Sequence, residues 1–288
     1  MTIVLATPGS DGLDAAVVAL REWQSDAAPR QLHPGDVGWF WQLGAQATAA
    51  AVRTWSRDGR ILAVGLLDGP GLLRITTAPE TRRDRELARS VIADVIEPGR
   101  GVLPEGAVDV EAPPDALILD QLLEAGWVAG EPWTPLHRDL TEPVPPPAGR
   151  IEVVDADRVA DRVEVQRAAF GGSSFTTQRW QAMAAGSLYR DARCLIAYAD
   201  SGAAAAIVTV WSAGPGKPGL LEPLGVHPDH RRRGHGTAIT VAAAAALREL
   251  GASSAFVCTP SGNLGAVPTY VSAGFQPHAE VRDAHRPG

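Results

Sequence analysis

A cluster of prolines near the middle of the sequence, TEPVPPPAG at 141–149, constrains the fold more than any other feature. Each proline ring fixes φ and removes a backbone donor, so neither a helix nor a central strand can pass through this segment. The segment therefore predicts a short, stiff linker. It divides the chain into two candidate domains of nearly equal length, 1–140 and 150–288.

The two halves share landmarks in the same order. Pro79 in "PETRRDRELARSVIADVI" aligns with Pro228 in "PDHRRRGHGTAITVAAAA" at an offset of 149 residues. The tripeptide AGW at 125–127 aligns with AGF at 273–275 at an offset of 148 residues. Two landmarks that agree within one residue indicate an internal duplication. The alternative, two unrelated α/β domains with a similar helix-stop pattern, stays open because the halves are otherwise little alike.

Strand and helix patterns alternate through the second half. Strands are expected at 150–154, 193–200, 203–213, 217–226, 254–259 and 275–281, and helices at 158–170, 177–185, 236–250 and 264–273. This order predicts an α/β (α+β) fold whose mixed, mostly antiparallel sheet is flanked by helices, and the duplication predicts the same plan in the first half.

Composition excludes several classes of protein. Hydrophobic residues make up 45% and charged residues 20%, which favours a packed core over disorder. A net charge of −7 argues against a dedicated nucleic-acid binder. Cys194 and Cys258 lack metal-ligand spacing, so no metal is expected. The start of the chain lacks a leader pattern and no apolar run reaches about 20 residues, so we expect a cytoplasmic protein without a membrane partner.

The stretch HPDHRRRGHG at 227–236 is the strongest candidate site. It lies between an expected strand and an expected helix, where unpaired backbone N–H groups favour a bound anion. Gly234 and Gly236 let the backbone approach a pyrophosphate closely. A nucleotide P-loop is excluded because no Lys-Ser/Thr follows the glycines, and a dinucleotide fingerprint is excluded because Ile239 replaces its third glycine.

What the stretch does match is [R/Q]-x-x-G-x-[G/A], filled by Arg231, Gly234 and Gly236. This pattern resembles the coenzyme A pyrophosphate loop of the GNAT superfamily of N-acetyltransferases. Downstream, NLGAVPTYVSAGF at 263–275 is similar to the second signature of that superfamily. Both motifs occur in the expected order, with a strand between them. The overall plan, a tandem with a degenerate first half, is similar to that of mycothiol synthase, from which only the architecture is carried over.

The resemblance implies acetyl-CoA as co-substrate and a set of coenzyme-binding residues. They lie in the strand before the loop, in the loop and in the second motif: Leu224, Gly225, Val226, Arg231, Arg232, Arg233, Gly234, His235, Gly236, Thr237, Asn263 and Tyr270. Within this set the Val226 N–H would polarise the acetyl carbonyl, Asn263 would lie beside the pantetheine, and Tyr270 would protonate the departing thiolate. Simple packing of Tyr270 in a helix is the alternative.

Direct attack of an amine on the thioester also needs a base. Glu222 is the candidate, because strand alternation places it on the same face as Leu224 and Val226. A capping or solvated role is its alternative, and His227 and His230 are weaker candidates for the base. The acceptor is expected to be a small-molecule or peptide amine, and the chain a monomer or a homodimer. A coenzyme A-binding regulatory or scaffold protein without turnover is the alternative function.

The first half lacks the residues that make this loop. At offset 149, Gly234 aligns with Arg85 and Arg233 with Asp84, while at offset 148 Tyr270 aligns with Leu122. A carboxylate near the helix start would repel a pyrophosphate, so this half is expected not to bind the coenzyme. Its unusual piece is HPGDVGWFW at 33–41, where alternation would place Trp39 and Trp41 on one face for packing or as an aromatic wall.

Overall fold

The computed structural model describes residues 2–28 and 30–288 and divides the chain into two compact units. The first unit consists of residues 1–33, 45–133 and 279–288, and the second of residues 34–44 and 134–278. Neither unit is a continuous half of the sequence. The boundaries at 140 and 150 describe the repeat in the sequence and stay a prediction, whereas packing assigns 34–44 to the second unit and 279–288 to the first.

The first unit holds one sheet with the strand order β1-β2-β3-β4-β5-β13-β6. Its elements are β1 (Val4–Ala6), α1 (Leu13–Trp23), α3 (Ala45–Ala51), β2 (Val52–Arg57), β3 (Arg60–Leu67), β4 (Leu72–Thr77), α4 (Arg85–Ile96), β5 (Val108–Glu111), α5 (Leu117–Glu124), the start of β6 (Val128–Asp139) and β13 (Val281–Arg286). Strands β4 and β5 run parallel, and the neighbouring pairs run antiparallel. Its core joins Trp55 and Ile75 of the sheet to Leu87 and Val91 of α4.

The second unit repeats this order as β7-β8-β9-β10-β11-β6, with β12 paired to β6. Its elements are α2 (Pro34–Phe40), the end of β6, β7 (Arg150–Val153), α6 (Val159–Ala169), α7 (Thr177–Ala184), β8 (Ala192–Tyr198), β9 (Ala204–Ser212), β10 (Gly219–Val226), α8 (His235–Glu249), β11 (Ser254–Pro260), α9 (Ala266–Ser272) and β12 (Gln276–Pro277). Strands β10 and β11 run parallel. The predicted fold class is confirmed in both units.

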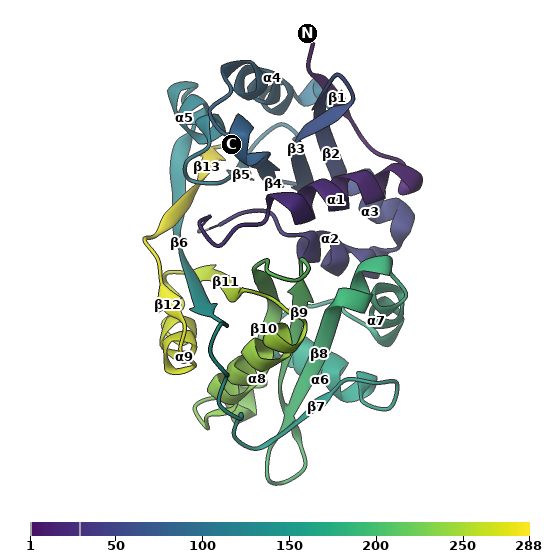
Figure 1. Ribbon diagram of the computed structural model, residues 1–288, viewed down its shortest axis with the longest axis vertical. Helices are drawn as coiled ribbons and strands as arrows, with labels where there is room; N and C mark the ends of the chain where they lie inside the picture. Colours follow the sequence, from purple (N-terminus) through teal and green to yellow (C-terminus); the bar gives the residue numbers. More distant parts are fainter. Residues whose placement is uncertain (1, 29) are drawn as a thin grey trace. The chain divides into compact units, whose positions relative to one another are not determined.

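The side chains of strand β9 alternate between the two faces of the second sheet. Val208 and Val210 point into the core that α8 closes, together with Leu247 of that helix. Because side chains alternate along a strand, Thr209 and Trp211 point to the opposite face, which contacts α6 and α2. Helix α8 lies across the sheet in Figure 1. Its alanine-rich sequence suits this position, since small side chains allow close packing on the strands.

Each sheet is completed by a strand from the other half of the sequence. In the first unit β13 pairs with β5 and β6, and Ala284 in the middle of β13 is 1% exposed. In the second unit the end of β6 pairs with β12, and Leu136 is 0% exposed. The last strand expected at 275–281 is therefore wrong: the chain forms β12, leaves the second sheet and enters the first as β13.

The segment HPGDVGWFW also differs from its prediction. Residues Pro34–Phe40 form helix α2 and residues Trp41–Leu43 a 3-10 turn, so strand alternation does not apply to Trp39 and Trp41. Proline at the first helical position starts the helix, because its missing N–H needs no partner there. Trp39 stacks on Phe175 with ring centroids 5.3 Å apart, and the Trp41 ring lies against Gly186. Both tryptophans therefore pack within the second unit.

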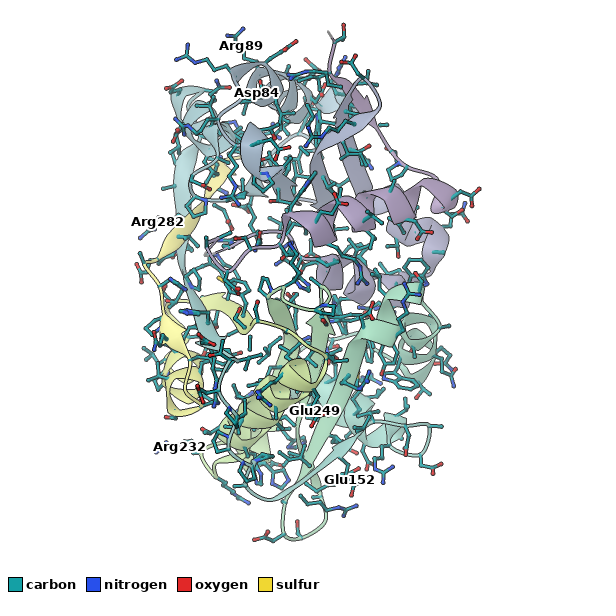
Figure 2. All side chains as sticks on the ribbon, viewed as in Figure 1. Asp84, Arg89, Glu152, Arg232, Glu249 and Arg282 are labelled. Atoms are coloured by element: carbon teal, nitrogen blue, oxygen red, sulfur yellow. The ribbon has the colours of Figure 1, made fainter. Side chains whose placement is uncertain are left out.

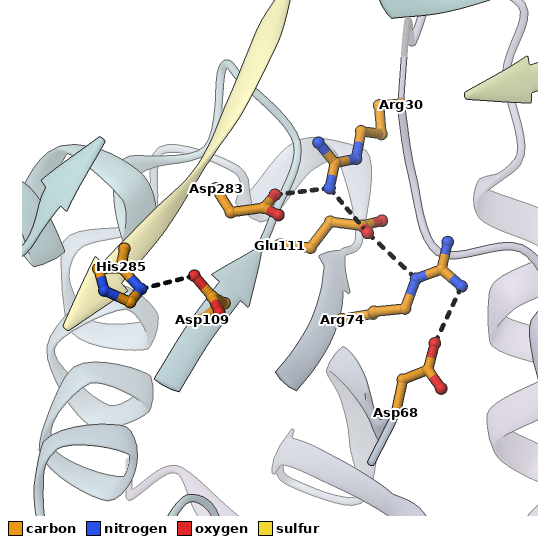
Figure 3. Close-up of polar contacts among 7 residues, drawn as sticks. All are labelled: Arg30, Asp68, Arg74, Asp109, Glu111, Asp283 and His285. Atoms are coloured by element: carbon orange, nitrogen blue, oxygen red, sulfur yellow. Dashed lines mark hydrogen bonds and ion pairs between the residues drawn. The ribbon is translucent and has the colours of Figure 1, made fainter. Parts of the chain in front are cut away.

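Buried charges tie the C-terminal strand into the first unit (Figure 3). The Arg30 guanidinium lies 2.5 Å from Asp283 of β13 and 2.7 Å from Glu111 of β5. Glu111 also accepts a hydrogen bond from Arg74 at 3.1 Å. Although desolvation favours protonation, the charges of Arg74 and Arg30 lower the pKa of Glu111 to about 2. Desolvation, with the nearby charge of Glu111, raises the pKa of Asp283 to about 6.

Candidate functional site

The two parallel strands of the second unit separate early. The described ladder joins Gly219 to Ala255 and Leu220 to Phe256 and ends there. On its other edge β10 has a register shift between Leu221 and Leu224. In the first unit the corresponding strands stay paired further along, through Arg74 and Glu111. In both units the first strand of the parallel pair extends past the end of its described ladder, and in the second unit this leaves the backbone of β10 beyond Leu220 available for a ligand.

The register shift corrects the reasoning behind Glu222. Leu221 and Leu224 both pack in or against the core on the α8 side, so alternation counted back from Val226 does not decide the face of Glu222, and the predicted face stays a prediction. Its charge nevertheless acts on Tyr270, which places the carboxylate near the phenol. Glu222 is half-buried, and its backbone carbonyl accepts a hydrogen bond from the Trp211 indole at 2.8 Å.

Gly225 occupies a position that has no room for a side chain. A Cβ there would lie 2.8 Å from Ala169 Cβ and 2.8 Å from a ring carbon of Phe170, at the end of α6. Leu224 and Val226 are half-buried and pack from the other face. Glycine therefore lets α6 touch the backbone of β10 beside the register shift.

The start of α8 presents its backbone amides without a side-chain cap. Gly234 is the N-cap residue in the left-handed region with φ +85°, where glycine is favoured, and it carries no capping group. His235, Gly236 and Thr237 follow as the first helical residues, and amides at these positions have no acceptor within a helix. An uncapped N-terminus of this kind favours an anionic ligand.

Gly236 links the two sequence motifs in space. A Cβ there would lie 3.1 Å from Thr269 Cγ2 of α9 and 3.4 Å from Val226 Cγ2 of β10. The first turn of α8 therefore touches both the preceding strand and the helix that carries the second motif. This close packing is one reason for a glycine at position 236. The approach of a phosphate, predicted from the sequence, would be a second reason.

The three arginines of the loop have different environments. Arg231 donates to the carbonyl of Val226 at 3.3 Å and to the carbonyl of Ala169 at 3.5 Å, which joins the loop to β10 and α6. Arg232 and Arg233 are exposed, and Arg232 projects from the surface in Figure 2. Arg231 is exposed as well, so all three arginines are accessible, and their contact with the phosphates stays a prediction.

Three histidines surround the same loop. The ring of His230 lies 5.6 Å from that of His227 and 5.9 Å from that of His235. Desolvation, with the charges of His230 and Arg233, lowers the pKa of His235. His227 Nδ1 accepts a hydrogen bond from the Asp229 amide. Within residues 2–28 and 30–288 no cluster of three or more His, Cys, Asp or Glu side chains fits a metal ion.

Tyr270 lies at the buried end of the second motif. Its side chain is 6% exposed and packs beside Phe275, with ring centroids 5.9 Å apart. In the described chain its hydroxyl makes no hydrogen bond. Burial raises the pKa of Tyr270, and the charges of Glu222 and Cys258 add to the effect. The phenol is therefore protonated at neutral pH and has its proton free to donate.

Asn263 is exposed at the start of the second motif. Its side-chain oxygen accepts a hydrogen bond from the Ala266 amide at 3.2 Å, which caps the beginning of α9. The side-chain NH₂ group still points away from that bond and is able to donate to a ligand. Asn263 thus has a structural role besides the predicted contact with pantetheine.

The corresponding helix of the first unit is closed by its own side chain. Asp84 caps α4 by accepting from the amides of Glu86 at 2.8 Å and Leu87 at 3.0 Å, and Figure 2 labels it. Arg57 pairs with both Asp84 and Glu86. Desolvation raises the pKa of Asp84, but the hydrogen bonds from Leu87 and Arg57 outweigh it and lower the pKa overall. A carboxylate thus fills the position that Gly234 leaves open.

One segment of the second unit matches the sequence model of a known family. Residues 161–275 match the sequence model of the acetyltransferase (GNAT) family. This segment is a GNAT domain. It contains the register shift of β10, the open start of α8 and Tyr270. No curated protein matches the sequence.

Solved structures of GNAT proteins share the fold over 99% of the chain. A GCN5-related N-acetyltransferase from Sphaerobacter thermophilus has a TM-score of 0.62 at 18% identity and is covered over 95% of its length. A tandem GNAT protein from the clavulanic acid biosynthesis pathway has a TM-score of 0.59 at 16% identity, with 98% covered. A GNAT-family acetyltransferase from Colwellia psychrerythraea has a TM-score of 0.58 at 15% identity, with 98% covered. These similarities show the fold alone.

Several neighbours of this GNAT site gave no signal in the sequence. Trp211 supports the carbonyl of Glu222, Phe170 touches Gly225, and Thr269 touches Gly236. Each contact joins residues far apart in the chain, so no local pattern marks it.

In the described part of the chain, no helix is long and apolar enough to cross a membrane.

Proposed function

We propose that the protein is an acetyl-CoA-dependent N-acetyltransferase whose single coenzyme site lies in the GNAT domain of the second unit. The observation that carries this proposal is the uncapped start of α8 at Gly234, set against the capped start of α4 at Asp84. Backbone amides of His235, Gly236 and Thr237 would hold the pyrophosphate, with Arg232 and Arg233 near the phosphates.

The backbone of β10 beyond Leu220 would pair with the pantetheine arm, because β11 no longer pairs with it there. Leu224, Gly225 and Val226 form this segment, and the Val226 N–H would donate to the acetyl oxygen as negative charge develops on it. Asn263 would donate to the pantetheine from the other side. This arrangement holds the thioester at a fixed place beside Glu222.

The chemistry would be a direct transfer without a covalent enzyme intermediate. The acceptor amine attacks the thioester carbonyl and loses a proton to Glu222, directly or through water. When the tetrahedral intermediate collapses, the C–S bond breaks and Tyr270 donates its proton to the departing thiolate. Holding amine and thioester together supplies much of the rate. The acceptor would be a small-molecule or peptide amine.

Two measurements test this function. Calorimetric titration of the full chain with acetyl-CoA should give one site, and thiol release should depend on an added amine from a panel of amino acids, small amines and peptides. Binding without thiol release from any amine would favour a regulatory or scaffold protein instead. Two equivalent coenzyme sites, or none, would contradict the assignment of the site to the second unit alone.

A further inference from the structure

The second unit buries a positive charge that no carboxylate balances. Arg162 of α6 is 0% exposed. Its guanidinium donates to Thr209 Oγ1 at 3.1 Å and to Gln166 Oε1 at 3.3 Å, which are both neutral groups. Its Nε is buried and has no partner, and among the described residues no carboxylate pairs with this side chain. A buried cation in this state gains from any anion that reaches it.

Aromatic rings hold this guanidinium from one side. Its central carbon lies 4.5 Å from the ring centre of Phe175 and 6.0 Å from that of Trp39. The two rings stack on each other with an interplanar angle of 11°. Cation–π contacts stabilise the charge in part and keep the group cationic. Trp39 is half-buried, whereas Phe175 is 2% exposed.

A chain of contacts connects this charge with the acyl-transfer residues. Arg162 donates to Thr209 of β9, and Trp211 of the same strand lies edge-on to Tyr189 with ring centroids 6.3 Å apart. Trp211 in turn donates its indole proton to the Glu222 carbonyl at 2.8 Å. Thr209 and Trp211 share one face of β9, the face opposite α8. The cluster thus reaches Glu222 from the side away from the uncapped helix start.

We propose that Arg162, Trp39 and Phe175 select the acceptor, and that the acceptor is an amine with a carboxylate or similar anionic group on an aromatic or apolar body. This inference rests on the proposed acetyltransferase function. The anion would pair with the Arg162 guanidinium after the Trp39 ring turns aside, and the body would lie against Phe175. The amine would then be directed toward Glu222.

A matched pair of acceptors tests this assignment. The probes are 4-(aminomethyl)benzoic acid and its carboxamide, in which the ring separates the amine from the group that differs. We expect the acid to have a kcat/KM at least about tenfold higher than the amide, the size of one charge-assisted hydrogen bond. Arg162→Gln should remove this preference while coenzyme affinity is unchanged. Arg167→Gln, an exposed arginine on the same helix, serves as the control and should keep it.

Binding provides a second measurement that needs no turnover. Phenylacetate should bind the coenzyme-loaded protein at least about tenfold more tightly than phenylacetamide and change the tryptophan fluorescence, and Trp39→Phe should reduce that change. Equal binding of the two probes, or equal turnover of the two amines, overturns the proposal and leaves the acetyltransferase function intact. A chain that binds no coenzyme contradicts the proposed function itself.

Loss of Arg162 also removes core contacts, so a charge-preserving variant is needed. If Arg162→Gln does not fold, Arg162→Lys decides the question. A KM change confined to the carboxylated acceptor supports a direct contact with the anion, because lysine keeps the charge but lacks the planar fork. An equal change for acid and amide shows a purely structural arginine and overturns the proposal.

Discussion

Replacing Tyr270 by phenylalanine separates its proposed chemical role from its packing role. The Tyr270 hydroxyl makes no hydrogen bond in the described chain, and the ring packs beside Phe275. Tyr270→Phe keeps that ring and loses no partner, so the free energy of unfolding should change by less than about 0.5 kcal/mol. If the hydroxyl protonates the thiolate, turnover should fall about 10²–10⁴-fold with coenzyme affinity nearly unchanged.

Tyr198 provides a control with the opposite behaviour. This tyrosine of β8 is also buried, but its hydroxyl donates to Asp161 Oδ2 at 2.9 Å. Tyr198→Phe should therefore lower the free energy of unfolding by about 1–2 kcal/mol and leave turnover unchanged. Urea unfolding followed by tryptophan fluorescence, and thiol release at saturating acetyl-CoA, measure the two quantities on both variants.

The pH dependence of the same variants gives an independent check. Because burial raises the pKa of Tyr270 above its ordinary value of about 10, the protonated acid persists to higher pH. Wild-type turnover should therefore show no alkaline decline between about pH 7 and pH 10. Full turnover in Tyr270→Phe, or a loss of about 1 kcal/mol or more in its stability, would refute the assignment of this hydroxyl as a free acid.

Three further predictions concern the coenzyme loop and the C-terminal strand. Gly236→Asp should weaken coenzyme binding at least about hundredfold in a calorimetric titration, because it adds bulk against Thr269 and a negative charge at the helix start; retained affinity would place the phosphates elsewhere. Deleting 279–288 removes β13 and should cost the first unit about 3 kcal/mol or more, seen as faster hydrogen exchange in β5, since β5 loses its ladder partner and the core loses Ala284; unchanged exchange would contradict the strand assignment. Desolvation raises the folded pKa of Asp283 to about 6, above an unfolded value of about 3.9, so ionisation destabilises the fold as pH rises through that window. Asp283→Asn should remove this fall in unfolding free energy between about pH 4 and pH 6, and an unchanged curve would argue against it.

Local patterns predicted most elements of the second unit. The helix expected at 236–250 is observed at His235–Glu249, and the strand expected at 203–213 at Ala204–Ser212. The loop motif and the second motif also meet in space as their order suggested, through Gly236 and Thr269. These predictions succeeded because they rest on local features. A glycine at a helix end or at a close approach of two backbones can be recognised from its immediate neighbours in the sequence.

Errors arose where distant contacts decide the structure. HPGDVGWFW alternates like a strand, but Pro34 starts a helix whose Trp39 ring packs on Phe175, more than 100 residues away. Alternation along β10 is interrupted by the register shift between Leu221 and Leu224, so it does not decide the face of Glu222. Arg162 had no motif at all, since only the folded sheet brings Thr209 beneath it. The environment of each of these residues can be predicted only when the three-dimensional structure is known.

The exchange of β6 and β13 between the sheets has a consequence for the history of this chain. A gene encoding either half alone would produce a domain that lacks an interior strand, so neither half can be lost without damage to the other. Selection would then preserve the first half for its strands while leaving its loop free to change. Asp84 as the N-cap of α4, where α8 has Gly234, fits a copy that was kept for assembly after its coenzyme loop had been lost.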